Sequence, residues 1–182
     1  MEHHVQVRAS AAFRALNPLG QIPLLQDGDL TLCDSSAILV YLCKRYAPGS
    51  SWLPQDAAGA AAVQRWLSVA AGELAYGPAT ARALAQWKAP GDPVRAAAIA
   101  QRLFAFMEAH LASRTFLAAD HATIADLACY GYTAHAPEGG ITLAPYPALR
   151  AWLKRVEALP DFVPMPDSPL PDSPLPDSPQ PQ

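Results

Sequence analysis

The sequence has few charged residues and no excess of basic ones. Lys, Arg, Asp and Glu make up 16% of its 182 residues, and the formal net charge is −3. Nucleic acids and anionic membranes are recognised by basic patches or stripes, and the sequence contains none. The sequence therefore predicts no nucleic-acid partner and no membrane partner.

Cysteine is also scarce. The chain has three cysteines, Cys33, Cys43 and Cys129, and none of them belongs to a Cys-x-x-Cys motif. An odd number of scattered cysteines without the spacing of metal ligands indicates reduced thiols rather than a disulfide framework. We therefore expect no metal site and a reducing, cytoplasmic environment.

Long apolar runs are missing as well. Met1 is followed by Glu2-His3-His4, without the basic region and apolar run of a signal peptide. No stretch approaches the length of about 20 apolar residues that a membrane helix needs. These absences predict a soluble intracellular protein.

The first part of the chain predicts an α/β arrangement. The sequence is 51% hydrophobic, which is enough to bury a core over most of its length. Apolar runs on both sides of Asp27-Gly28 are typical of a hairpin, and Asp34 or Ser35 stands where a helix cap is expected. In chain order we expect a remnant strand at 5–7, a helix at 11–16, strands at 22–25 and 30–32 around a turn at 26–29, and a helix ending at Arg45.

After Pro54 the pattern changes to long helices. Apolar residues recur at helical spacing over 57–75, 93–111 and 147–159, and Thr123-Ile124-Ala125-Asp126 is a capping box with Asp in place of the usual Glu. We therefore expect a first domain over residues 1–46, a linker over 47–56 and an all-helical domain over 57–165.

The last residues, 166–182, form a proline-rich repeat. Pro166-Asp167-Ser168-Pro169-Leu170 recurs at 171–175 and, in part, from Pro176. Such a segment cannot build a core, so we expect a disordered or polyproline-like tail. It is either a ligand for a proline-binding module or a solvated extension without a function.

Two short motifs in the first part point to a binding site. If the Ile22-Pro23 bond is cis, the turn exposes the Ile22 amide and carbonyl, which can bind the backbone of a peptide. Asp34 offers a carboxylate to an ammonium group, and Ser35 offers a hydroxyl and a backbone amide to a carboxylate. Each motif has a simpler interpretation, a trans proline at a strand edge and an ordinary helix cap. Together they predict a site for the α-amino-acid end of a ligand.

These motifs lie in segments that resemble a known family. Residues 17–25 and 34–42 resemble the glutathione-binding core of cytosolic glutathione S-transferases, and residues 123–128 resemble the capping box of that family's helical domain. Residues 136–140 and the segment from Tyr146 to Phe162 are similar to bacterial members. The resemblance covers about residues 11 to 165, with the motifs in the family's order and spacing.

The resemblance implies an α+β fold, in which a partial thioredoxin-like domain is followed by an all-α domain, and a two-fold homodimer. Glutathione is the implied co-substrate. Ile22 before a cis-Pro23 would bind its cysteinyl backbone, Asp34 and Ser35 would hold its γ-glutamyl group, and Gln21 could reach its glycyl end.

The implied reaction is the conjugation of glutathione to electrophilic small molecules, as in detoxification. The helical domain would hold the apolar electrophile, and Trp66, Tyr76 and Trp87 are the candidate residues of that pocket. Aromatic residues at helical spacing are also compatible with core positions, so the sequence leaves both interpretations open for these three.

The chain departs from the family in its first residues. The thiol-activating Tyr, Ser or Cys of the family lies on a first strand–helix unit, but only Met1 to Ser10 precede the helix at 11–16. Loss of a central strand would leave backbone groups and apolar surface uncovered, so we expect the natural protein to begin upstream. The catalytic residue is therefore unknown.

Three functions remain open: a transferase, a glutathione-binding or interaction module without turnover, and another glutathione-dependent reaction such as peroxide reduction, dehalogenation or disulfide reduction.

Overall fold

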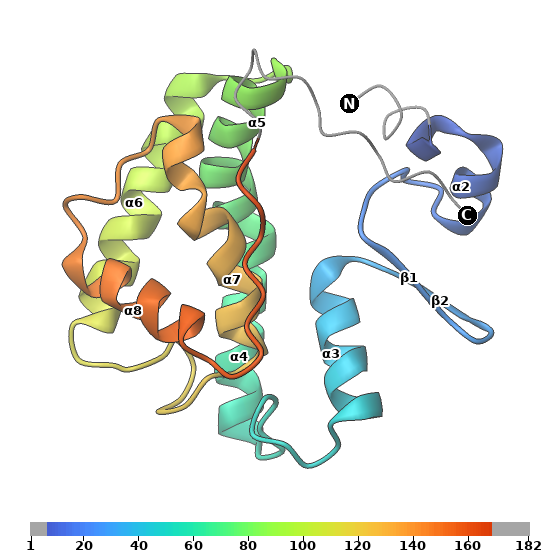
Figure 1. Cartoon of the computed structure of the whole chain (residues 1–182), viewed down its shortest axis with the longest axis horizontal. Helices are drawn as coiled ribbons and strands as arrows, with labels where there is room; N and C mark the ends of the chain where they lie inside the picture. Colours follow the sequence, from blue (N-terminus) through green and yellow to red (C-terminus); the bar gives the residue numbers. More distant parts are fainter. Residues whose placement is uncertain (1–6, 169–182) are drawn as a thin grey trace.

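A computed structural model describes residues 7–168 of the chain. An N-terminal part lies beside a larger helical part, and the chain passes from one to the other after α3 (Figure 1). The N-terminal part contains α2 (Ala11–Leu16), β1 (Leu24–Asp27), β2 (Leu30–Cys33) and α3 (Ser35–Tyr46). Among the described residues, no helix is both long and apolar enough to cross a bilayer.

The first described residues are helical. Val7 lies in a helical turn, and the other two residues of the expected strand at 5–7 lie outside the described residues. The strand prediction is wrong for Val7, because the Ser10 hydroxyl donates to the Val7 carbonyl over 2.7 Å and favours a turn. The same hydroxyl accepts from the Phe13 amide and caps α2, whose predicted bounds are confirmed.

The predicted hairpin is confirmed, with a later start. The strands β1 and β2 are antiparallel, and Leu24 lies opposite Cys33. Gly28 takes a φ of +57° in the turn, which glycine adopts without steric cost. Strand β1 begins at Leu24 rather than Ile22, since Pro23 has no N–H for the ladder. The sheet of residues 7–168 consists of these two strands.

Two tyrosines of α3 join this helix to the hairpin. The phenols of Tyr41 and Tyr46 both donate to Oδ2 of Asp27, with a distance of 2.8 Å from Tyr41. The hydrogen bonds from Tyr46 and Tyr41 lower the pKa of the Asp27 carboxyl. Because Asp27 ends β1, these bonds hold the helix against the hairpin.

The helical part follows the predicted order of helices. Asp92 caps α6 by accepting from the amides of Val94 and Arg95 at 2.9 and 3.1 Å, and Pro93 occupies the first helical position, as predicted. The elements are α4 (Ala57–Val69), the π-helical segment η1 (Ala70–Ala79), α5 (Thr80–Trp87), α6 (Pro93–Leu111), α7 (Ile124–Ala134), the 3₁₀ turn η2 (Ala136–Gly139) and α8 (Pro147–Glu157).

The helix expected over 57–75 does not end there but continues through η1 into α5. Pro78 lies inside η1, where it has no N–H to donate, and the Thr80 amide and hydroxyl both donate to the Ala75 carbonyl, the hydroxyl over 2.9 Å. A Cβ on Gly77 would lie 2.9 Å from a backbone nitrogen of α6. Gly77 therefore allows η1 to pack closely on α6 at the residue before the proline.

The core lies in the helical part. Its largest fully buried side chains include Trp66, Leu74, Phe104, Met107 and Trp152, which come from α4, η1, α6 and α8. The observed arrangement, an α/β part followed by an all-helical part, is the one that the sequence predicts.

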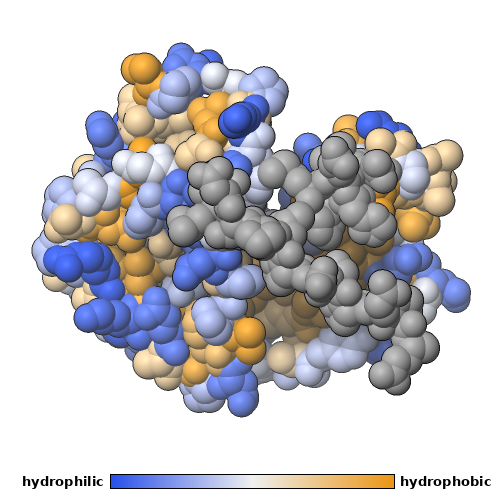
Figure 2. All heavy atoms as spheres, turned by 45° about the horizontal axis from the view of Figure 1, so that its top comes forward, coloured by the Kyte–Doolittle hydropathy of each residue, from blue (hydrophilic) through white to orange (hydrophobic). Residues whose placement is uncertain are grey.

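The N-terminal part keeps much apolar surface exposed. Two strands and two helices do not cover one another's apolar faces, and large hydrophobic side chains are between 38% and 76% exposed, namely Leu16, Leu19, Ile22, Leu30 and Leu42. Figure 2 shows hydrophobic residues at the surface of this part as well as of the helical part. This exposure agrees with the expectation that so small a sheet leaves apolar surface uncovered.

Candidate functional site

The turn before β1 presents free backbone groups. The Ile22-Pro23 bond is cis, as the binding interpretation of this motif requires. The Ile22 amide and carbonyl have no hydrogen-bond partner among the described residues, and the Ile22 side chain is 62% exposed. One free donor and one free acceptor therefore stand at the start of a strand, where an extended ligand can pair with them.

Asn17 holds this turn in place. Its side chain is 4% exposed, donates from Nδ2 to the Gln21 carbonyl over 2.7 Å and accepts from the Leu19 amide over 3.2 Å. Asn17 was not among the site residues predicted from the sequence. Asn followed by Pro18 is a signal for a turn of this kind, since an Asn side chain bonds the backbone two residues on.

The start of α3 presents a carboxylate and a hydroxyl. Asp34 caps the helix through Oδ1, which accepts from the Ala37 amide over 2.9 Å, while Oδ2 has no partner among residues 7–168. Ser35 is the first residue of the helix and exposed, and its hydroxyl is likewise unpaired within the described chain. Of the two caps that the sequence allows, the structure selects Asp34 and leaves the Ser35 hydroxyl and the first amides of α3 available for an anion.

Asp34 also has an unusual backbone conformation. Its φ is +79°, a region that few residues other than glycine occupy and that carries a conformational cost. Such positions are common at binding sites, where the surrounding structure holds a side chain in one orientation.

The sheet register brings the two motifs together. Leu24, which follows Pro23, pairs with Cys33, which precedes Asp34. Paired strands lie about 4.7–4.9 Å apart, so the turn at Ile22-Pro23 and the cap at Asp34 meet at the same end of the hairpin. We call this set of residues, Gln21, Ile22, Pro23, Asp34 and Ser35, the hairpin corner.

The three aromatic candidates for a second pocket have different surroundings. Trp66 is 1% exposed and lies against Phe106 and His110, with ring centroids 5.5 and 4.9 Å away, so no face of its indole is open to a ligand. The structure thus corrects its assignment to a pocket, and Trp66 is a core residue. Tyr76 and Trp87 are 69% and 41% exposed.

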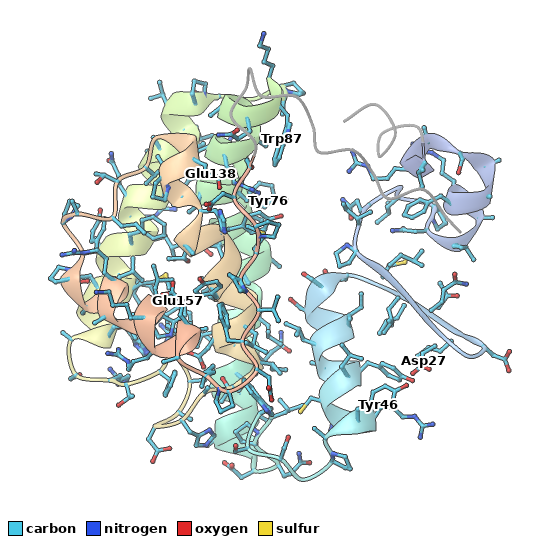
Figure 3. All side chains as sticks on the ribbon, viewed as in Figure 1. Asp27, Tyr46, Tyr76, Trp87, Glu138 and Glu157 are labelled. Atoms are coloured by element: carbon cyan, nitrogen blue, oxygen red, sulfur yellow. The ribbon has the colours of Figure 1, made fainter. Side chains whose placement is uncertain are left out.

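Tyr76 and Trp87 lie on the side of the helical part that faces the N-terminal part (Figure 3). Tyr76 projects from η1, and Trp87 ends α5, where the Arg82 guanidinium lies 5.1 Å from its ring centroid. The structure therefore keeps these two residues as candidates for contact with an apolar ligand.

The cysteines do not form a reactive centre. All three are free, and Cys43 and Cys129 are buried. Burial raises the pKa of the Cys129 thiol, and its Sγ donates to the Trp66 carbonyl over 3.6 Å. Cys33 lies next to the hairpin corner with its Sγ 3.9 Å from the Leu16 carbonyl, and no base or cation contacts it among the described residues.

Family models match both parts of the chain. A model described as the N-terminal domain of glutathione S-transferase matches residues 1–51, and one described as the C-terminal domain matches residues 92–160. Mouse glutathione S-transferase theta-1 is 33% identical over 174 residues, which cover 86% of this chain and 71% of the mouse protein. Human glutathione S-transferase theta-1 is 34% identical over 82% of this chain and 66% of its own length. The chain spans about two thirds of the length of these relatives.

Solved bacterial structures share the fold. A glutathione S-transferase from Pseudomonas fluorescens Pf-5 superposes with a TM-score of 0.81 at 32% identity, over 88% of this chain and 81% of the other. The theta class glutathione S-transferase of the citrus canker pathogen Xanthomonas axonopodis pv. citri, solved with glutathione bound, gives a TM-score of 0.72 at 31% identity, over 84% and 75% of the two chains.

Proposed function

Because the chain belongs to the glutathione S-transferase family, we propose that it binds glutathione at the hairpin corner and transfers it to an electrophilic small molecule. The matches to the two domain models and to the solved structures confirm the family and the fold class predicted from the sequence. That fold is a partial thioredoxin-like domain followed by an all-α domain. Glutathione transfer is the reaction of this family, and glutathione is its co-substrate.

The hairpin corner offers a complementary group for each end of the tripeptide. The Ile22 amide and carbonyl pair with the cysteinyl backbone in the manner of an added antiparallel strand. The free Oδ2 of Asp34 accepts from the γ-glutamyl ammonium, and the Ser35 hydroxyl and the amides that begin α3 donate to its carboxylate. The exposed Gln21 side chain reaches toward the glycyl end. The observation that carries this proposal is the sheet register that joins both motifs at one end of the hairpin.

In the transfer reaction glutathione itself is the nucleophile. The protein positions it and stabilises its thiolate, while Tyr76 and Trp87 provide apolar contact for the electrophile on the facing side of the helical part. No residue of the hairpin corner is proposed to donate to the thiolate. We further propose a cytoplasmic role in detoxification and a two-fold homodimer, which would cover apolar surface left exposed on the N-terminal part.

A second candidate function is glutathione binding without turnover. One observation favours it: the hairpin corner offers groups for the backbone and the γ-glutamyl end of glutathione, and the neighbouring thiol of Cys33 contacts no base or cation among the described residues. Another glutathione-dependent reaction, such as peroxide reduction, dehalogenation or disulfide reduction, would use the same binding residues.

A turnover assay separates these functions. The chain is mixed with glutathione and an activated aryl chloride, and thioether formation is followed by absorbance against the uncatalysed reaction. A rate above background that saturates with both reactants supports the transferase. Saturable glutathione binding with a background rate supports the binding module, and reduction of a peroxide or disulfide under the same conditions supports the third reading.

A further inference from the structure

A second polar cluster lies in the helical part, away from the hairpin corner. The Arg82 Nε donates to Oε2 of Glu138 over 2.7 Å, and His135 Nδ1 donates to Oε1 of the same carboxylate over 2.6 Å. Arg82 and His135 are each 7% exposed, and both contact the carboxylate of Glu138, which Figure 3 labels in the helical part. None of these side chains takes part in the proposed glutathione site.

Backbone packing holds this cluster together. A Cβ on Gly139 would lie 2.5 Å from the Arg82 amide nitrogen, so η2 and α5 approach as closely as glycine allows. Gln86 adds a hydrogen bond from Nε2 to the Glu138 carbonyl over 3.1 Å. The cluster is therefore fixed by the fold of the helical part and does not depend on the tail for its position.

Residues 165–168, where the tail repeat begins, lie on this cluster. His135 Nε2 donates to the Met165 carbonyl over 3.1 Å, the Ser168 amide donates to Oε1 of Glu138 over 3.2 Å, and Arg82 donates to the Ser168 hydroxyl over 2.7 Å. Figure 1 shows this last described segment running along the helical part beside α7. The tail prediction is thus modified for residues 166–168, which are ordered against the domain, whereas residues 169–182 lie outside the described residues.

The charges of the cluster are compatible with an acidic peptide. The Arg82 guanidinium pairs with the Glu138 carboxylate, and the Asp167 carboxylate lies 3.8 Å from His135 Nδ1. Asp167 is exposed, so its contribution is modest.

Every group that contacts the cluster recurs in the later copies. The contacts use the carbonyl of the residue before the first proline, the Asp carboxylate, and the amide and hydroxyl of Ser. Leu170 and Leu175 stand in the place of Met165, and Ser173 and Ser178 stand in the place of Ser168. We propose that Arg82, His135 and Glu138 form a binding site for the sequence Pro-Asp-Ser, occupied by residues 166–168 of this chain.

A bound cation is the competing interpretation. His135, Glu138 and Asp167 offer ligand atoms within 4.8 Å of one another, as a metal site would. The Arg82 guanidinium, however, already bonds Glu138, and a second cation beside it would be repelled. The cluster thus favours a peptide with donors and a carboxylate over a metal ion.

The test uses the full chain with Ser168, Ser173 and Ser178 each replaced by Pro, which removes the amide and hydroxyl from every copy. A free peptide of the sequence of residues 170–175 is then added while the Arg82 Nε–H signal is followed by NMR. Because a short tether gives an effective concentration of about 1 mM, the peptide is titrated to about 10 mM. We expect a saturable shift, and none with a peptide in which Ser is replaced by Pro.

The site variant Glu138→Gln, added to the same chain, should weaken peptide binding at least tenfold. The parent chain supplies a second readout, since its Ser168 amide should exchange at least tenfold more slowly than a free peptide amide. The proposal is overturned if the folded variant shows no saturable shift, if the parent Ser168 amide exchanges at the free rate, or if micromolar Zn²⁺ alone displaces the parent's tail and shifts the signals of His135.

Discussion

Trp152 donates from its indole Nε1 to Oδ1 of Asp126 over 2.9 Å, and this bond joins α8 to the start of α7 in the core. Asp126 is fully buried and also accepts from the amides of Leu117 and Thr123 and from the Thr123 hydroxyl. The predicted capping box is confirmed, and its carboxylate also anchors two further segments.

Removal of this carboxylate should destabilise the helical part strongly. Asp126→Ala leaves several buried donors without an acceptor, and each such group costs about 1–3 kcal/mol. We expect a loss of about 3–5 kcal/mol in the free energy of unfolding, measured by urea denaturation. The exposed Asp120→Ala should change it by less than about 0.5 kcal/mol. If Asp126→Ala and Asp120→Ala had equal stability, the hydrogen bonds of Asp126 would not stabilise the helical part as proposed.

The stability of the tail cluster should depend on acid pH. Burial raises the pKa of Glu138, but hydrogen bonds from Ser168, His135 and Arg82 outweigh it and lower the pKa from 4.5 to about 2. The ionised form is favoured in the folded chain, so the stabilisation is complete above pH 4.5 and is lost as the pH falls toward 2. Glu138→Gln should flatten the decline of unfolding free energy over this range. If the dependence of the unfolding free energy on pH were the same in Glu138→Gln as in the parent, the pKa of Glu138 would be equal in the folded and unfolded chains.

The exposed aromatics should affect the electrophile and not glutathione. Tyr76→Ala and Trp87→Ala each remove apolar contact worth about 1–2 kcal/mol, so kcat/KM for an apolar electrophile should fall about tenfold. The affinity for glutathione should stay the same, because neither residue belongs to the hairpin corner. Tyr132→Ala, at another exposed tyrosine of the helical part, serves as the control. A loss of glutathione affinity in either variant would contradict this division of roles.

Trp66 should behave as a core residue. Trp66→Ala removes a buried indole that stacks on Phe106, which costs about 3–5 kcal/mol of stability. Where the variant remains folded, its KM for the electrophile should match that of the parent in steady-state assays. If Trp66→Ala instead raised the KM for the electrophile without a loss of stability, Trp66 would contact the electrophile and would not be a core residue.

The parts of the fold that were predicted rest on local signals. Asp92-Pro93 marks the start of α6, Gly28 marks the hairpin turn, and Thr123 with Asp126 marks the start of α7. The two motifs of the hairpin corner were also found from the sequence, because a cap and a turn are properties of a few neighbouring residues.

The rest depends on packing between distant segments. Trp66 and Tyr76 both fit helical spacing, and only the position of α6 determines that the first is buried and the second is exposed. Arg82 and Glu138 are 56 residues apart and carry no local signal of their contact. The close approach of η1 to α6 at Gly77 likewise joins segments that are distant in the sequence.

The most direct test of the central claim is glutathione binding by isothermal titration calorimetry. Asp34→Asn is the informative variant, because Asn keeps the helix cap but removes the charge that binds the γ-glutamyl ammonium. Asp29→Asn, in the exposed hairpin turn, is the matched control. The account predicts saturable binding to the parent, at least tenfold weaker binding to Asp34→Asn and a change of less than about twofold for Asp29→Asn, as expected for a charge-assisted hydrogen bond of about 1.5–3 kcal/mol. No binding to the parent, or equal affinity of the parent and Asp34→Asn, would contradict it.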